Sequence, residues 1–285
     1  MWNHFKTLLL LVSLSALLLI IGDLWGGPTG LTIALIFALL MNGVAYWFSD
    51  RIVLMLHRAQ PLSEAEAPRV HAIVRELAAR AGIPMPRIYR VATSVPNAFA
   101  TGRNPQHAAI AVTDGILHLL NEEELRGVLA HELSHVLNRD ILVTTVAAVL
   151  ASAIMYLARM AQWALFWFSW GRDDDDRGAN PLGLLAMAIL APIAALLIQL
   201  WVSRTREYMA DERGARLVGR PDGLIRALQK IENYMHGVHV EAPSPALSPL
   251  YFARMRSNWL TEWFSTHPPV EKRVERLLRL FGRAV

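Results

Sequence analysis

Four long stretches with almost no charge constrain this 285-residue chain more than any other feature of its sequence. They cover residues 7–22, 24–49, 141–171 and 178–203, and Arg159 is the one charged residue inside them. A helix of about 20 apolar residues crosses the hydrocarbon core of a bilayer. The sequence therefore predicts four transmembrane helices, at about 7–24, 28–48, 141–163 and 181–202.

The overall composition agrees with a membrane protein. Hydrophobic residues make up 54% of the chain and charged residues 18%, against roughly 25% charged in a soluble domain. These values argue against a fully soluble single domain and against a disordered chain. The chain has no cysteine, which excludes disulfides, thiolate metal ligands and cysteine nucleophiles.

The four segments form two hairpins, residues 1–50 and 141–202, because a short loop joins each pair. Basic residues near the segment ends favour the cytoplasmic side. Lys6 precedes the first segment and arginines follow the second and the fourth, whereas the loop at 22–30 has no basic residue. We therefore expect both termini and the polar stretches 51–140 and 203–285 in the cytoplasm. Arg159 either reaches the far interface or lines a protein-filled or wet region, and the sequence does not choose between them.

The two polar stretches predict a mixed α/β domain that the second hairpin divides. The Ser63–Glu66 spacing is typical of a capping box and precedes a helical pattern that ends at Gly82. Runs at 87–91, 98–101 and 108–113 are strand-like, with a turn at 102–105. Helices are expected after Asn121 and after Pro269. The fold class is thus a mostly helical α+β membrane protein with a small β-sheet.

The helix expected after Asn121 carries the sequence His-Glu-Leu-Ser-His at residues 131–135. A spacing of four residues places His131 and His135 on one helical face, one turn apart, where both rings can bind one Zn²⁺. Glu132 lies beside them and is the expected base toward the attacking water. Two surface histidines and a solvated glutamate are the alternative.

A third ligand is expected from the second polar stretch. If the segments at 141–163 and 181–202 run antiparallel, Glu207 emerges at the same depth below the membrane as His131 and His135. Asp211 follows one helical turn later and is suited to orient a ligand histidine. The alternative for Glu207 is an ion pair with Arg204 or Arg213.

Four sequence elements together resemble the HtpX family of membrane zinc metallopeptidases, relatives of the CaaX prenyl endopeptidases. The elements are residues 131–135, the Glu207-x-x-x-Asp211 pair, residues 96–100 and residues 266–268. The resemblance covers nearly the whole chain. It implies a gluzincin-like catalytic core on the cytoplasmic face of a bacterial inner membrane, one zinc per chain held by His131, His135 and Glu207, and Glu132 as the catalytic residue. From the resemblance alone, the substrates are damaged or misfolded membrane proteins, a role in protein quality control during stress.

Two further regions are candidates for the reaction. His267, ahead of Pro268 and Pro269, is a candidate stabiliser of the developing oxyanion, or else a surface histidine in a turn. Residues 97–101, with Asn97, Ala98, Phe99 and Ala100, could offer an edge strand to an extended substrate, or form an ordinary core strand.

Three other kinds of protein could carry a similar zinc motif. An intramembrane protease would carry its zinc motif inside an apolar segment, but charged residues stand on both sides of the motif here. A peptide deformylase needs a cysteine ligand, and this chain has no cysteine. A membrane scaffold or holdase that keeps the motif without turnover remains the alternative of a different class. The expected partners are protein substrates and the lipid bilayer. No nucleic-acid-binding module is visible, and the sequence does not give the oligomeric state or the cleavage preference.

Overall fold

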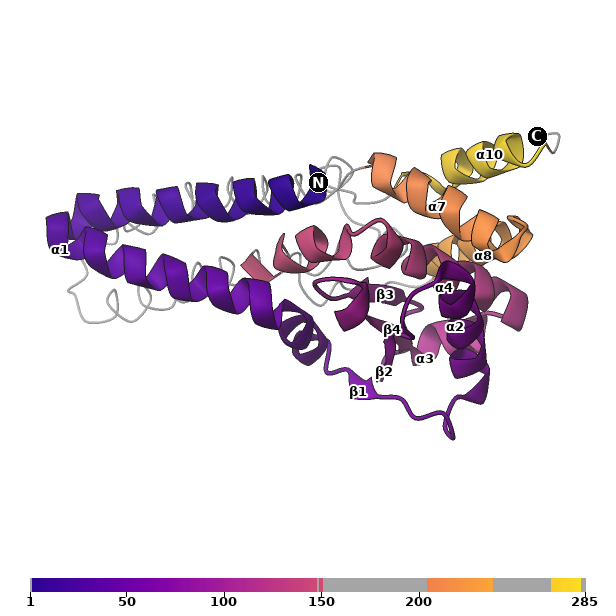
Figure 1. Cartoon of the computed structure of the whole chain (residues 1–285). Helices are drawn as coiled ribbons and strands as arrows, with labels where there is room; N and C mark the ends of the chain where they lie inside the picture. Colours follow the sequence, from indigo (N-terminus) through magenta and orange to yellow (C-terminus); the bar gives the residue numbers. More distant parts are fainter. Residues whose placement is uncertain (1, 148, 151–203, 238–267, 283–285) are drawn as a thin grey trace, which may run out of the picture.

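The protein is described by a computed structural model over residues 2–147, 149–150, 204–237 and 268–282. It begins with α1 (Trp2–Leu56), whose backbone leaves helical geometry at Gly27. Gly27 has φ 53° and is followed by Pro28, so a residue tolerant of positive φ and a helix-starting proline make the turn. Figure 1 shows α1 as two arms that lie alongside each other, and Asn42 donates a hydrogen bond to Ser15 between them. The two arms meet at Gly27, within the loop at 22–30 that the sequence predicts.

One helix of the described residues, Gly27–Leu56, is long and apolar enough to cross a membrane. Its 30 residues exceed the roughly 20 that a bilayer core requires. Four transmembrane helices are therefore not confirmed. Residues 151–203, with Arg159 and most of the second expected hairpin, lie outside the described residues.

A small mixed sheet forms the centre of the polar part. Its strands are β1 (Gln60–Pro61), β2 (Arg87–Val91), β3 (Ala98–Thr101) and β4 (Ala109–Thr113). The spatial order is β1-β2-β4-β3, with β2 and β4 parallel and the outer pairs antiparallel. The short 3₁₀ helix η1 (Pro105–His107) lies in the β3–β4 connection. The mostly helical α+β class and the three main strands are confirmed.

The two faces of the sheet bury different parts of the protein. In β4, Ile110 and Val112 face the helices of the polar part, whereas Ala109 and Ala111 pack with the end of α1 and with helical residues within 142–147 and 149–150. This alternation follows from the two-residue period of a strand. The helices of the apolar stretches therefore complete the core of the polar part instead of merely tethering it.

Helices lie on the side of the sheet's first face, some in contact with the strands and others packed on other helices (Figure 1). They are α2 (Pro68–Ala81), α3 (Asp114–Leu119), α4 (Glu122–Leu137), α7 (Arg204–Val218), α8 (Asp222–Gly237) and α10 (Val270–Leu280). The expected boundaries at Asn121, Gly82 and Pro269 agree with these helices. Ser63 and Glu66 form both reciprocal hydrogen bonds of the predicted capping box, but α2 itself starts only at Pro68. Pro68 supplies the fixed φ of a first helical residue, so the chain begins the helix there.

Candidate metal centre

The central helix α4 is held rigidly at its N-terminus and along its length. Asn121 and Glu124 form a reciprocal capping box, and three glutamates occupy the first turn, where the helix dipole favours negative charge. Leu129 and Leu133 are fully buried, and truncating a buried leucine typically costs about 2–5 kcal/mol. This burial fixes the face on which His131 and His135 project.

Helix α7 crosses α4 at close range because of a glycine. A Cβ on Gly214 would lie 2.9 Å from the backbone nitrogen of His131, closer than packed atoms allow. Glu207, Asp211 and Gly214 follow one another at helical spacing, so they share the face of α7 that meets α4. The close approach delivers Glu207 to the two histidines.

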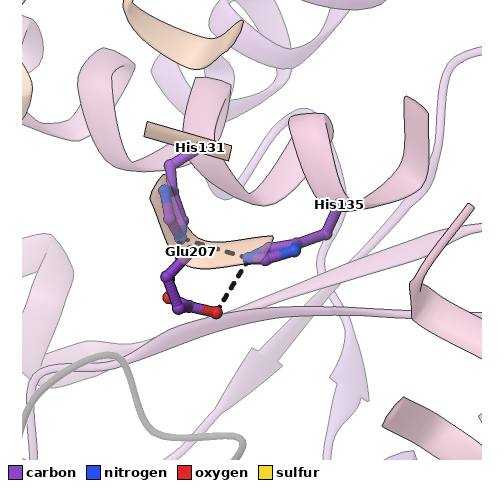
Figure 2. A group of neighbouring side chains, drawn as sticks. All are labelled: His131, His135 and Glu207. Atoms are coloured by element: carbon purple, nitrogen blue, oxygen red, sulfur yellow. Dashed lines mark hydrogen bonds and ion pairs between the residues drawn. The ribbon is translucent and has the colours of Figure 1, made fainter. Parts of the chain in front are cut away.

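The three expected ligands converge. The Nε2 atoms of His131 and His135 are 3.2 Å apart, and each is 3.7 Å from a carboxylate oxygen of Glu207. Figure 2 shows the two rings and the carboxylate directed toward one another. His131 and His135 come from one helix and Glu207 from a segment 72 residues later, as the antiparallel-hairpin argument predicts.

The donor set and its spacing fit a zinc ion. Tetrahedral zinc with Zn–N bonds of about 2.0–2.1 Å separates its ligand atoms by about 3.3 Å, close to the 3.2 and 3.7 Å between these atoms. Two imidazoles and one carboxylate are also a ligand set of catalytic zinc, with a fourth position left for water or substrate.

The far nitrogen of His131 is held by a buried ion pair. Its Nδ1 lies 2.8 Å from Asp211, and Arg273 of α10 donates two hydrogen bonds to the same carboxylate, at 2.8 and 2.6 Å. All three side chains are almost fully buried. Burial would raise the pKa of Asp211, but Arg273 and His131 outweigh it and lower that pKa to about 2. Asp211 is thus placed where the sequence expects an orienting group.

The far nitrogen of His135 is held by Asp140, which the sequence interpretation did not single out. The Asp140 carboxylate oxygens lie 3.1 and 3.2 Å from His135 Nδ1, and Asp140 is fully buried. Burial alone would lower the pKa of His135, but Asp140, Glu207 and Glu132 raise it to about 10.

Glu132 is buried between the histidines and the sheet. It is 5% exposed, and its Oε2 accepts a hydrogen bond of 2.9 Å from the backbone N–H of Ala100. Burial, assisted by the negative charge of Glu207, raises the pKa of Glu132 to about 7. A carboxylate with a pKa near the working pH is suited to both accept and return a proton.

Within the described residues, no strand pairs with the outer edge of β3, which lies next to Glu132. Thr113 N–H donates to the Asn97 carbonyl, so Asn97, Phe99 and Thr101 form the hydrogen-bonded pairs with β4. The main-chain groups of Ala98 and Ala100 therefore point away from β4. The side chain of Phe99 packs in the core formed with α1. The side chains are buried, as the core-strand interpretation expects, and β3 is the last strand in the sheet order; pairing of a substrate along it stays a prediction.

One expected site residue cannot be placed, and one residue of the site was not expected from the sequence. His267 lies outside the described residues. Arg273 was missed because it looks like a polar-face residue of an amphipathic helix. Its position one turn before Leu277, which is also buried, is the signal that could have placed it inward.

The chain matches a known protein family over most of its length. Residues 64–280 match Peptidase family M48. The chain belongs to peptidase family M48. The matched region contains α4, α7 and α10, and therefore all the described residues of the site.

Relatives match over nearly the full length. A protein named Protease HtpX homolog from Syntrophobacter fumaroxidans is 53% identical over 279 residues, which are 97% of this chain and 99% of that protein. A second one, from Pyrococcus furiosus, is 52% identical over 277 residues, 96% of this chain and 95% of that protein. The resemblance to the HtpX family is thereby confirmed, and it supports a membrane protease.

The fold also resembles a solved structure. The crystal structure of Ste24p from S. mikatae matches 96% of this chain with a TM-score of 0.52 and 19% identity, and the match spans 65% of the Ste24p chain. At this identity the likeness shows a shared fold only.

Proposed function

We propose that this protein is a zinc-dependent membrane endopeptidase, with His131, His135 and Glu207 as the zinc ligands and Glu132 as the general acid and base. The convergence of two Nε2 atoms and one carboxylate at 3.2 to 3.7 Å carries this proposal. Membership of peptidase family M48 supports it. Cleaving damaged or misfolded membrane proteins as part of quality control is the role that the HtpX resemblance favours.

The residues of the site divide the work of hydrolysis. When bound, a zinc ion polarises the scissile carbonyl and makes a water molecule more acidic. Glu132 takes the proton of the attacking water and returns it to the leaving nitrogen. The main chain of Ala98 and the carbonyl of Ala100 pair with an extended substrate along the outer edge of β3, while the Ala100 N–H stays bonded to Glu132. His267 is proposed to donate a hydrogen bond to the oxyanion, in addition to the metal.

A membrane scaffold that binds unfolded chains without cutting them is the second candidate function. No feature of the described residues favours it, since the site has a buried carboxylate poised for proton transfer, which a scaffold does not need.

Zinc affinity is expected to rise about tenfold per pH unit between about pH 7 and 9. His135 has a pKa near 10 in the metal-free protein, so zinc must displace one proton from it throughout this range. Chelator-competition titrations at several pH values, corrected for the chelator's own protonation, measure the slope. An affinity that stays constant over this range would contradict the release of a proton from His135 on zinc binding.

Four membrane crossings with both termini in the cytoplasm are part of the proposal. The basic residues near the segment ends and the two arms of α1 support it. Because the chain has no cysteine, single cysteines report topology without background. In intact cells, a membrane-impermeant thiol reagent should label Asp175→Cys and leave Gln106→Cys unlabelled until the cells are opened. The reverse pattern would overturn the orientation.

A further inference from the structure

Asp140 occupies the junction between the candidate metal centre and the apolar helix that follows it. Three residues separate the end of α4 at Leu137 from helical residue 141. Asp140 is the last of the three, and its backbone carbonyl accepts a hydrogen bond from Thr144 N–H at 3.1 Å. Its carboxylate turns back and accepts from Nδ1 of His135. Asp140 therefore belongs to the apolar helix through its backbone and to the metal centre through its carboxylate.

The helix that begins beside Asp140 is firmly packed. Leu142, Val146 and Leu150 are buried with Val53 and Leu54 of α1, against one face of the sheet. This packing fixes the backbone of Asp140, so the carboxylate has a rigid support.

Each histidine of the centre has the same arrangement. Nε2 points to the shared position, and Nδ1 donates to a buried carboxylate, Asp211 for His131 and Asp140 for His135. A hydrogen bond at Nδ1 fixes both the tautomer and the rotation of the ring, so that Nε2 keeps its lone pair for a metal.

The two carboxylates differ in their positive partners. Asp211 receives two hydrogen bonds from Arg273. No arginine of the described ranges donates a hydrogen bond to Asp140, but the positive charge of Arg206 acts on Asp140 and Glu207. Arg206 is 8% exposed, and its Nη1 and Nη2 make no hydrogen bond to any residue that the structure describes. Arg206 therefore offsets the buried negative charge without competing with His135 for the Asp140 oxygens.

A simpler role for Asp140 is the N-cap of the helix beginning at residue 141, because aspartate is a favoured N-cap residue. The contacts argue against this as its main role. The carboxylate accepts a hydrogen bond from His135. In the described part of the chain, no backbone N–H of the following helix donates to it.

We propose that Asp140 is a positioning residue of the metal centre: its carboxylate orients His135 and ties this ligand to the start of the apolar helix. This inference rests on the proposed function, since it takes His135 to be a zinc ligand. It implies that zinc affinity depends on how helical residues 141–147 pack against α1 and the sheet.

The test measures zinc dissociation constants of the full-length protein in detergent by chelator competition. Asp140→Ser keeps a good N-cap residue but is too short to reach His135, and Asp140→Asn keeps the size and loses the charge. Thr144→Val is the matched control, because Thr144 donates to the Asp140 and Ile141 carbonyls but does not contact His135. Melting temperatures of the metal-free proteins show whether each variant folds.

Removal of an orienting partner typically weakens metal binding about 10- to 100-fold. We expect Asp140→Ser to raise the zinc dissociation constant within that range, Asp140→Asn to raise it less, and Thr144→Val to leave it within about twofold. In the Co²⁺-loaded protein, the paramagnetically shifted ring N–H proton of His135 should exchange with solvent faster in Asp140→Ser than in the wild type.

Two results would overturn the role of Asp140 and leave the proposed function standing. They are an unchanged zinc dissociation constant in Asp140→Ser, or a zinc affinity that is weakened equally in Thr144→Val. If Asp140→Ser does not fold, Asp140→Asn decides, and wild-type affinity in that variant contradicts the inference. Glu207→Gln is measured in parallel. Wild-type zinc affinity in Glu207→Gln would show instead that the proposed ligand set is wrong, and the role of Asp140 would fall with it.

Discussion

Replacing Glu132 with glutamine should lower the rate of peptide hydrolysis about 10⁴-fold or more. A single general base typically contributes about 10²–10⁴-fold, and Glu132 is proposed to act as both base and acid. Glutamine keeps the size of the side chain and can still accept the hydrogen bond from Ala100 N–H. Because Glu132 is not one of the three converging ligands, zinc content should stay at the wild-type level and substrate binding should survive.

The measurement pairs zinc analysis with the cleavage rate of a denatured membrane protein. Glu122→Gln is the matched control, since Glu122 is an exposed residue of the same helix that pairs with Arg126 on the surface, and it should cleave at the wild-type rate. Equal rates for the wild type and Glu132→Gln would remove Glu132 from the mechanism. If neither protein cleaves and both bind unfolded chains equally, the scaffold is the better account.

Replacing Glu207 with glutamine should weaken zinc binding by more than the roughly 10- to 100-fold expected for an orienting residue. A neutral amide is a much poorer zinc ligand than a carboxylate. The change also removes a negative charge that lies 3.7 Å from both Nε2 atoms. The fold should persist, because Glu207 contributes little to the apolar core and glutamine has its size.

Glu212→Gln on the same helix is the control for Glu207→Gln, because Glu212 pairs with Arg216 on the surface of α7. Zinc dissociation constants and melting temperatures are compared for both variants. Tight binding of one zinc by Glu207→Gln would exclude Glu207 from the site.

The local parts of the site were predictable because they depend on residues close in sequence. The helix around His131 follows from the Asn121 cap and a spacing of four residues, and three main strands follow from apolar runs and a turn. Glu207 was predictable for a different reason. The expected hairpin brings the ends of two apolar segments to the same depth, and that argument needs no side-chain detail.

Asp140 and Arg273 were not predictable in the same way, because their roles depend on tertiary contacts. Asp140 stands directly before an apolar helix, where an N-cap aspartate is the ordinary interpretation. Arg273 is a charged residue in a charged helix, and only the buried carboxylate of Asp211 explains why it turns inward. The packing of the sheet on α1 was missed as well, since strands of alanine and phenylalanine do not reveal what covers them.

Zinc titration into the metal-free wild-type protein, with cleavage of a denatured membrane protein followed at each step, tests the central claim most directly. The protein is extracted under chelation so that it starts without metal. We predict that cleavage is absent at the start, rises in proportion to added zinc, and reaches its maximum at one zinc per chain. Cleavage that persists under chelation, or a protein that binds one zinc and still cuts nothing, would contradict a zinc-dependent peptidase.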